Sequence, residues 1–189
     1  MDTGRIGLAA EFAARAHRNA VRKGEDIPYI AHPVEAAFIA AQLTDNEDVV
    51  IAALLHDVVE DAGCTPEDIR ERFGEAAAGL VAMETEDKMR DIPAEASWKL
   101  RKQAALEHIK NAPREAKIVC LADKLSNMRL SARTYQKVGD AMWERFNQKD
   151  KREQEWYYRG MAESLKELKD TDAYREYVSL CDAIFGKKD

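Results

Sequence analysis

The residues best suited to chemistry lie in one apolar stretch, residues 51–61, which reads IAALLHDVVED. Small and apolar residues dominate this stretch, as in a buried helix, yet it also contains four groups that water normally solvates: His56, Asp57, Glu60 and Asp61. On a helix, residues three and four apart share a face, so His56 and Asp57 would both neighbour Glu60. Burying unpaired charge costs several kcal/mol, so something must compensate these groups.

A divalent cation is the simplest compensator, because imidazole and carboxylate are good ligands and metal binding favours their deprotonated forms. The alternative is a polar cluster satisfied by lysine and arginine side chains from neighbouring helices. The stretch by itself leaves both interpretations open.

Composition limits the class of protein. The 189 residues suit one domain, residues 1–189, with enough length for a hydrophobic core. No apolar run approaches the roughly 20 residues of a membrane span, and the N-terminus lacks the features of a signal peptide. Cys64, Cys120 and Cys181 form no CxxC pair and are interpreted as free thiols of a cytoplasmic protein. The net charge of −6 argues against a general nucleic-acid binder.

Apolar residues recur at helical spacing almost throughout, which predicts an all-α domain of about nine or ten helices. Charged loops are expected at residues 86–97, with Pro93 as a helix breaker, and around residues 134–139. Thr65 and Pro66 form a typical helix start. The expected helices cover residues 5–22, 33–43, from about 47 onward, 66–74, 75–85, 98–111, 114–131, a short segment after 139, 151–169 and 171–185.

Two further polar residues stand out against these elements. His32 precedes Pro33, a proline suited to a first helical turn, so His32 is expected at the helix entry. Asp123 lies on the apolar side of the helix over residues 114–131. With His56 and Asp57 they make two imidazoles and two carboxylates, enough for four protein ligands around one metal ion.

The blocks PYIAHP, ALLHDVVED followed by CTPEDIRERFG, and LADKLSNMR resemble those of the HD hydrolase superfamily. The closest resemblance is to the hydrolase domain of the RelA/SpoT family, and within it to the stand-alone small alarmone hydrolases of the metazoan SpoT-homologue type. The resemblance covers residues 5–133, whereas the helices over residues 139–185 are less diagnostic. It implies an HD-domain helical bundle.

The resemblance also implies an activity, which is removal of the 3′-pyrophosphate of ppGpp or pppGpp with Mn²⁺. Carried over by motif, the metal ligands are His32, His56, Asp57 and Asp123. Glu60 and Asp61 match the acidic pair that positions and deprotonates the attacking water, and the residues do not distinguish which of the two takes the proton. This donor set suits Mn²⁺ but does not exclude Zn²⁺ or Fe²⁺.

The histidine count favours a single metal ion. Besides His32 and His56 the chain has only His17 and His108. His108 lies in a polar helix and is expected at or near the surface. His17 is interpreted as a structural residue or as a residue behind the metal ligands.

Substrate contacts follow from the same resemblance. Arg22 and Lys23 match basic residues that lie against the purine base, although cations at the solvated end of a helix would look the same. The loop continues Gly24-Glu25-Asp26, longer and more acidic than is usual in the family's long enzymes. Asn127 matches a residue that contacts the nucleoside.

Two alternatives remain open. The same metal site could act on another nucleotide, such as an adenosine analogue of the alarmone or the 2′-phosphate of NADPH. The domain could also bind a nucleotide or a partner without turnover. The sequence does not predict the oligomeric state.

Overall fold

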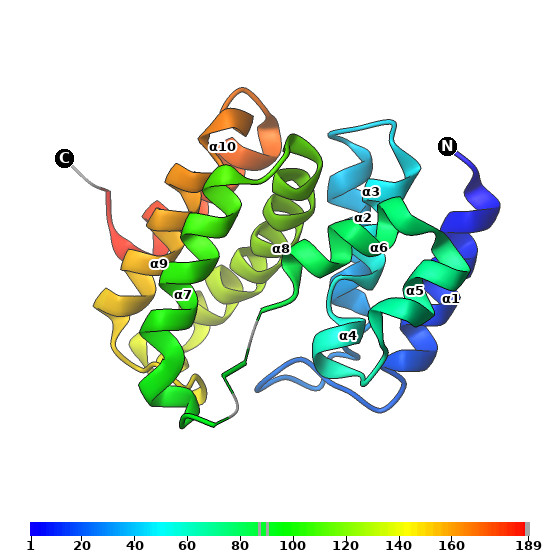
Figure 1. Cartoon of the computed structure of the whole chain (residues 1–189). Helices are drawn as coiled ribbons and strands as arrows, with labels where there is room; N and C mark the ends of the chain where they lie inside the picture. The colour runs from blue at the N-terminus through cyan, green and yellow to red at the C-terminus, as the bar shows by residue number, and fades with distance from the viewer. Residues whose placement is uncertain (87, 90, 188–189) are drawn as a thin grey trace. The chain divides into compact units, whose positions relative to one another are not determined.

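Helices make up all the regular structure in the described part of the chain. The computed structural model describes residues 1–86, 88–89 and 91–187, and the pairing in this part that is not helical is an isolated bridge between Val21 and Pro28 (Figure 1). The all-α prediction is therefore confirmed. The helices are α1 (Thr3–Ala16), α2 (Ala31–Ala41), α3 (Glu47–Leu55), α4 (Val58–Asp61), α5 (Pro66–Phe73), α6 (Glu75–Glu84), α7 (Ala94–Asn111), α8 (Arg114–Val138), α9 (Lys151–Ser164) and α10 (Asp172–Phe185), with 3₁₀ helices η1 (Gly139–Arg145) and η2 (Lys166–Leu168).

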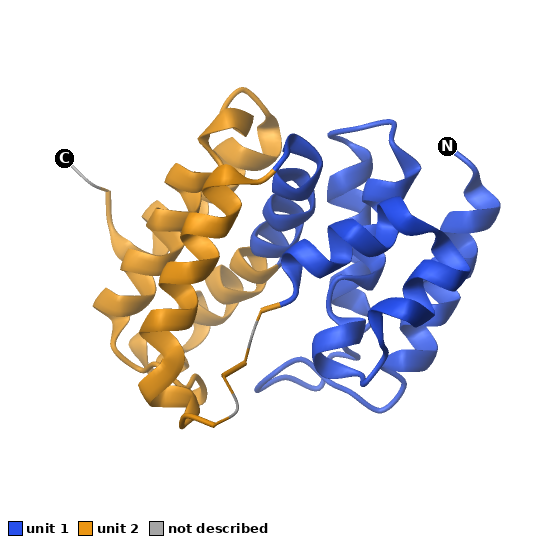
Figure 2. Ribbon diagram, viewed as in Figure 1, with its two compact units in different colours: residues 1–85, 113–126 blue, residues 86–112, 127–189 orange. Residues whose placement is uncertain are grey.

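The chain divides into two compact units, shown in different colours in Figure 2. Unit 1 comprises residues 1–85 and 113–126, and unit 2 comprises residues 86–112 and 127–189. Helix α8 contributes its first half to unit 1 and its second half to unit 2. The assignment of the whole chain to a single domain stays a prediction.

Unit 1 is built around α3, which packs against α1, α2 and α6. All seven residues from Val49 to Leu55 are buried. A helix that is apolar on every side has to lie inside a core, and this explains its central place. The residues that follow it, His56 and Asp57, consequently emerge in the interior of unit 1.

Unit 2 packs α9 against α7 and α10. Gly160 of α9 permits a close approach to α7, because a Cβ atom at this position would lie 2.8 Å from Leu106 Cδ1. Among the residues that the structure describes, no helix combines the length and the apolar character needed to cross a membrane.

Two predicted boundaries near the N-terminus are wrong. Helix α1 ends at Ala16 instead of residue 22, because the chain then turns back on itself and Arg22 N–H donates to Ile27 O at 2.8 Å. Gly24, with a φ of +76°, permits this turn. Helix α2 begins at Ala31, so His32 lies within its first turn and is not outside it.

Later boundaries differ as well. Helix α7 begins directly after Pro93, since proline is as suited to starting a helix as to ending one, and residues 94–97 are therefore helical. Helix α8 continues through residues 134–138 and ends at Val138, directly before Gly139, which has a φ of +59°. Helix α9 ends at Ser164, and η2 replaces its expected last turn. By contrast, the start at Thr65 is confirmed, with a capping box that involves Asp68.

Candidate metal centre

A break between α3 and α4 presents His56 and Asp57. Helix α3 ends at Leu55, and Asp57 has a φ of −97° and a ψ of −6° at the N-cap of α4. The continuous helix expected through this stretch is therefore wrong. An N-cap aspartate normally accepts a hydrogen bond from a backbone N–H of the first turn, but the Asp57 side chain accepts none from α4. Its carboxylate faces the histidines.

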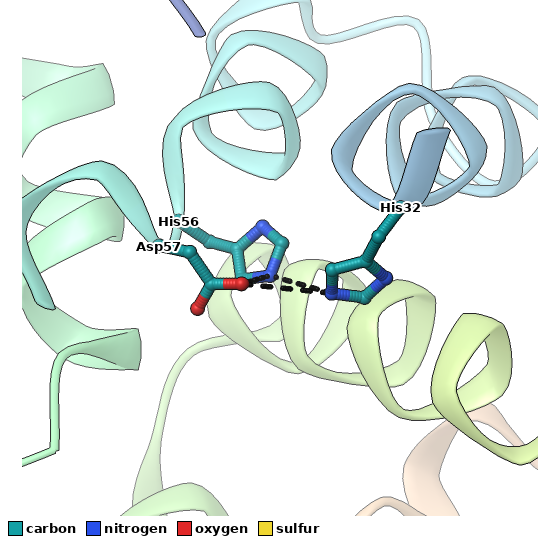
Figure 3. Close-up of side chains that lie close together, drawn as sticks. All are labelled: His32, His56 and Asp57. Atoms are coloured by element: carbon teal, nitrogen blue, oxygen red, sulfur yellow. Dashed lines mark hydrogen bonds and ion pairs between the residues drawn. The ribbon is translucent and has the colours of Figure 1, made fainter. Parts of the chain in front are cut away.

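Four side chains of unit 1 converge here, and Figure 3 shows three of them, His32, His56 and Asp57. Ligand atoms of these three lie within 4.8 Å of one another. His56 Nε2 is 2.9 Å from Asp57 Oδ2, and His32 Nε2 is 3.2 Å from His56 Nε2. Asp123 of α8 completes the cluster, with its Oδ1 3.1 Å from His32 Nε2 and 3.7 Å from His56 Nε2.

The main chain fixes the tautomer of His56. Its Nδ1 lies 2.9 Å from the carbonyl oxygen of Ala53, three residues earlier. A carbonyl only accepts hydrogen bonds, so Nδ1 carries a proton and donates. The Nε2 atom of neutral His56 is thereby left with a lone pair directed at the cluster.

Side chains fix the tautomer of His32. Its Nδ1 lies 2.8 Å from Ser126 Oγ, and the Ser126 hydroxyl donates to Glu35 Oε2 at 2.7 Å. Because the single hydroxyl proton is used on Glu35, Ser126 has to accept from His32 Nδ1–H. Both Nε2 atoms thus face each other with lone pairs, an arrangement that a proton or a cation between them stabilises.

The electrostatics of the cluster favour positive charge. Burial alone lowers the pKa of His56, but the carboxylates of Asp57 and Asp123 together raise it well above the usual value. Burial likewise opposes ionisation of Asp57, yet the charge of His56 holds the pKa of Asp57 below its usual range. Burial lowers the pKa of His32. Two imidazole nitrogens and two carboxylates in contact form a donor set that fits a divalent metal ion.

Two further ionisable groups flank Asp123. The Lys124 ammonium forms an ion pair with Asp123 Oδ2, the oxygen that does not contact His32. Glu84, at the end of α6, is half-buried, but its Oε1 is enclosed and has no hydrogen-bond partner among the described residues. Burial raises the pKa of Glu84 to about 7. The charge on Oδ2 of Asp123 is therefore compensated by Lys124, whereas Oδ1 faces the imidazoles.

Tyr29 contacts the cluster at Asp57. Its hydroxyl donates to Asp57 Oδ2 at 2.6 Å, and burial together with the Asp57 charge raises the pKa of Tyr29, so this donor keeps its proton. The His17 ring packs on Tyr29 with 4.7 Å between centroids, and the Arg22 guanidinium lies 5.4 Å from the Tyr29 ring centre. His17 is buried, and its Nε2 has no hydrogen-bond partner within the described residues.

The remaining predicted site residues lie on several elements. Glu60 is half-buried and Asp61 is exposed, both in α4, which directly follows Asp57. Lys23 is exposed in the turn that also carries Arg22, so the interpretation of these two cations as the end of a helix is wrong. Asn127 follows Asp123 by one turn of α8 and belongs to unit 2.

Three residues of the cluster's surroundings were not predicted: Tyr29, Glu35 and Ser126. Spacing offers a signal for two of them, because Glu35 follows His32 by three residues and Ser126 follows Asp123 by three. On a helix each pair shares a face. Tyr29 precedes α2 and has no comparable periodic signal.

Known proteins resemble this chain in sequence. A family model described as HD domain matches residues 9–150. The chain is 41% identical over 132 residues to guanosine-3′,5′-bis(diphosphate) 3′-pyrophosphohydrolase MESH1 of Xenopus tropicalis, covering 68% of this chain and 70% of the relative. It is 42% identical to human MESH1 over 125 residues, which cover 64% of this chain and 66% of the human protein.

Solved structures support the same fold. A metazoan orthologue of SpoT superposes with a TM-score of 0.76 over 97% of both chains, at 24% identity. The lmo0812 protein of Listeria monocytogenes EGD-e superposes with a TM-score of 0.72 at 32% identity, covering 82% of this chain and 99% of that one. Since the family model spans the residues that supply all four members of the cluster, the chain belongs to the HD domain family.

Proposed function

We propose that the chain is a metal-dependent phosphohydrolase that removes the 3′-pyrophosphate of ppGpp or pppGpp, giving GDP or GTP and pyrophosphate. The observation that carries the proposal is the convergence of His32, His56, Asp57 and Asp123 in a relative of enzymes named for this reaction. We further propose that the chain acts in the cytoplasm.

His32, His56, Asp57 and Asp123 would hold one divalent ion, with Mn²⁺ as the proposed metal. Such an ion supplies Lewis acidity and positive charge against the substrate's phosphates. Histidine nitrogens together with carboxylate oxygens are compatible with Mn²⁺ and with other first-row divalent ions. Metal analysis of the purified protein tests the identity.

Glu60 is the proposed general base. It lies in the four-residue helix whose N-cap is Asp57, so the same turn of backbone carries a ligand and the base. In the reaction, the oxygen of water ends on the released pyrophosphate, the bond to the 3′ oxygen breaks, and one proton ends on that oxygen. Glu60 would take a proton from the attacking water, and Asp61 would orient it or share this role.

Arg22 and Lys23 are the proposed contacts for the purine base, and Asn127 the proposed contact for the nucleoside. The half-buried Arg22 lies over Tyr29, whose hydroxyl binds Asp57, so a base packed on Arg22 would be near the ligands. Planar guanidinium groups stack well on purines. The acidic neighbours Glu25 and Asp26 lie in the same turn and would influence which base is accepted.

The test is incubation of the Mn²⁺-loaded protein with ppGpp, pppGpp, the adenosine analogue of ppGpp and NADPH in parallel. We expect GDP or GTP together with pyrophosphate from the guanosine substrates. Phosphate released from NADPH alone would overturn the substrate and keep the metal site. Absence of turnover and of bound metal would favour a binding module.

A further inference from the structure

The two histidines of the cluster are held in place by different means. The Nδ1–H of His56 donates to the main-chain oxygen of Ala53, which any residue at position 53 would provide. The Nδ1 of His32 depends on the hydroxyl of Ser126, and that hydroxyl depends on the carboxylate of Glu35. Only the second arrangement can be altered by substituting side chains.

We propose that Glu35 and Ser126 are positioning residues that commit His32 to the tautomer able to bind the metal. The inference rests on the metal site of the proposed function and goes beyond it, because it assigns roles to two residues that are not ligands. The chain Glu35–Ser126–His32 extends the common carboxylate–histidine support of metal sites by one inserted hydroxyl.

The direction of the hydrogen bonds at Ser126 determines which nitrogen of His32 carries the proton. A serine hydroxyl has one proton and can donate it either to His32 Nδ1 or to a carboxylate. With Glu35 Oε2 at 2.7 Å the proton is directed to the carboxylate, so Ser126 accepts from His32 Nδ1–H at 2.8 Å. Nε2, which lies 3.1 Å from Asp123 Oδ1, then keeps its lone pair. Without Glu35, the hydroxyl could donate to Nδ1 and stabilise the tautomer with the proton on Nε2, which cannot bind a cation.

Burial of His32 and Ser126 strengthens the control that their hydrogen bond has over the tautomer. His32 and Ser126 are 3% and 2% exposed, so water does not offer a substitute partner for Nδ1. Glu35 is half-buried, and its replacement therefore perturbs the core less than replacement of a fully buried residue. The pair also joins α2 to α8, which orients the His32 ring toward the cluster.

The variants Ser126→Ala, Ser126→Thr, Glu35→Ala and Glu35→Gln test the proposal, with Ser131→Ala as the matched control. Ser131 is another buried serine of α8, five residues later. The measurements are the Mn²⁺ dissociation constant of each full-length variant and the His32 tautomer, determined by long-range ¹H–¹⁵N NMR on protein treated with chelator.

We expect Ser126→Ala and Glu35→Ala to weaken Mn²⁺ binding by about 10- to 100-fold. Ser126→Thr should restore binding, because threonine keeps the hydroxyl, and Glu35→Gln should restore most of it, because the amide oxygen still accepts. The NMR signals of His32 should change from the Nδ1–H form to a mixture in Glu35→Ala. Ser131→Ala should match the unmodified protein in both measurements.

Two results would overturn the proposal. One is equal Mn²⁺ affinity in Ser126→Ala and Ser131→Ala. The other is an unchanged His32 tautomer in Glu35→Ala. The tautomer measurement does not depend on metal or turnover, so it distinguishes failure of this inference from failure of the proposed function.

Discussion

Carboxylates with little solvent exposure are compensated in opposite ways in the two units. In unit 2, Glu86 pairs with Arg101 and with Lys102, whose Nζ lies 2.6 Å from Glu86 Oε2. Arg101, 8% exposed, also donates to Ser97 Oγ at 3.2 Å and to Ala94 O at 3.3 Å. The charges of this ion-pair cluster are satisfied by neighbouring protein groups.

In unit 1, carboxylates and imidazoles face one another instead. Asp57 and Asp123 direct oxygens at His32 and His56, and the pKa of His56 is raised because the carboxylates favour positive charge there. Burial of acidic groups therefore does not by itself indicate a metal site. What indicates one is a set of acceptors whose lone pairs converge.

The largest effect is expected from Asp57→Ala. It removes the carboxylate nearest His56 and should eliminate metal binding and turnover together. A metal contributes several kcal/mol to the transition state, so we expect a loss of about 10⁴-fold in kcat/KM. Metal content and hydrolysis rate of the same preparation are the measurements. Retention of metal with full activity would exclude Asp57 as a ligand.

Glu60→Gln tests whether metal binding and hydrolysis can be separated. The metal should remain bound while kcat falls by about 10²- to 10³-fold, as expected for loss of a general base. The exposed Glu67→Gln in α5 serves as the control and should leave kcat unchanged. Full activity in Glu60→Gln would transfer the role to Asp61, to be checked with Asp61→Asn.

Glu86→Gln should affect stability without affecting the metal. The substitution removes the charge that pairs with the buried Arg101 and the half-buried Lys102, which costs about 2 kcal/mol of unfolding free energy. Urea unfolding measures this loss, and Mn²⁺ titration should give an unchanged dissociation constant. A large drop in metal affinity would contradict the assignment of Glu86 to stability alone.

Metal binding should be pH-dependent because a proton competes at His56. The pKa of His56 is raised, so the proton persists above pH 6.5 and has to leave when a cation binds. Affinity should therefore rise about tenfold per pH unit while His56 is protonated, and level off above its pKa. Calorimetry in buffers of different ionisation enthalpy counts the released proton. An affinity independent of pH would contradict the electrostatic account.

The ion pair of unit 2 should also weaken in acid, but only at a lower pH than metal binding. Burial opposes ionisation of Glu86, but Lys102 and Arg101 lower its pKa below 4.5. Its stabilising contribution is therefore complete above pH 4.5 and is lost as the pH falls through the lower folded value. Stability of Glu86→Gln between pH 6 and 3 should decline less steeply than that of the unmodified protein. Equal slopes would mean that Glu86 gains nothing from its partners.

Local signals predicted the parts of the fold that depend on local interactions. The cap at Thr65 and the apolar run over residues 49–55 are formed by neighbouring residues, and the structure has the predicted helix start at the first and a buried helix over the second. Helix ends at turns and at proline were less predictable, because the same residues are compatible with more than one local structure. The turn after Ala16 is closed by hydrogen bonds within residues 20–29, and Pro93 proved to be a helix start.

Residue types and motifs alone predict a metal site at His32, His56, Asp57 and Asp123. Tertiary structure alone decided how that set is held. The break after Leu55 redirects the Asp57 carboxylate, and packing brings Ser126 to a histidine 94 residues away. Contacts across such separations arise from the burial of whole helix faces, so the residue types cannot specify them one position at a time.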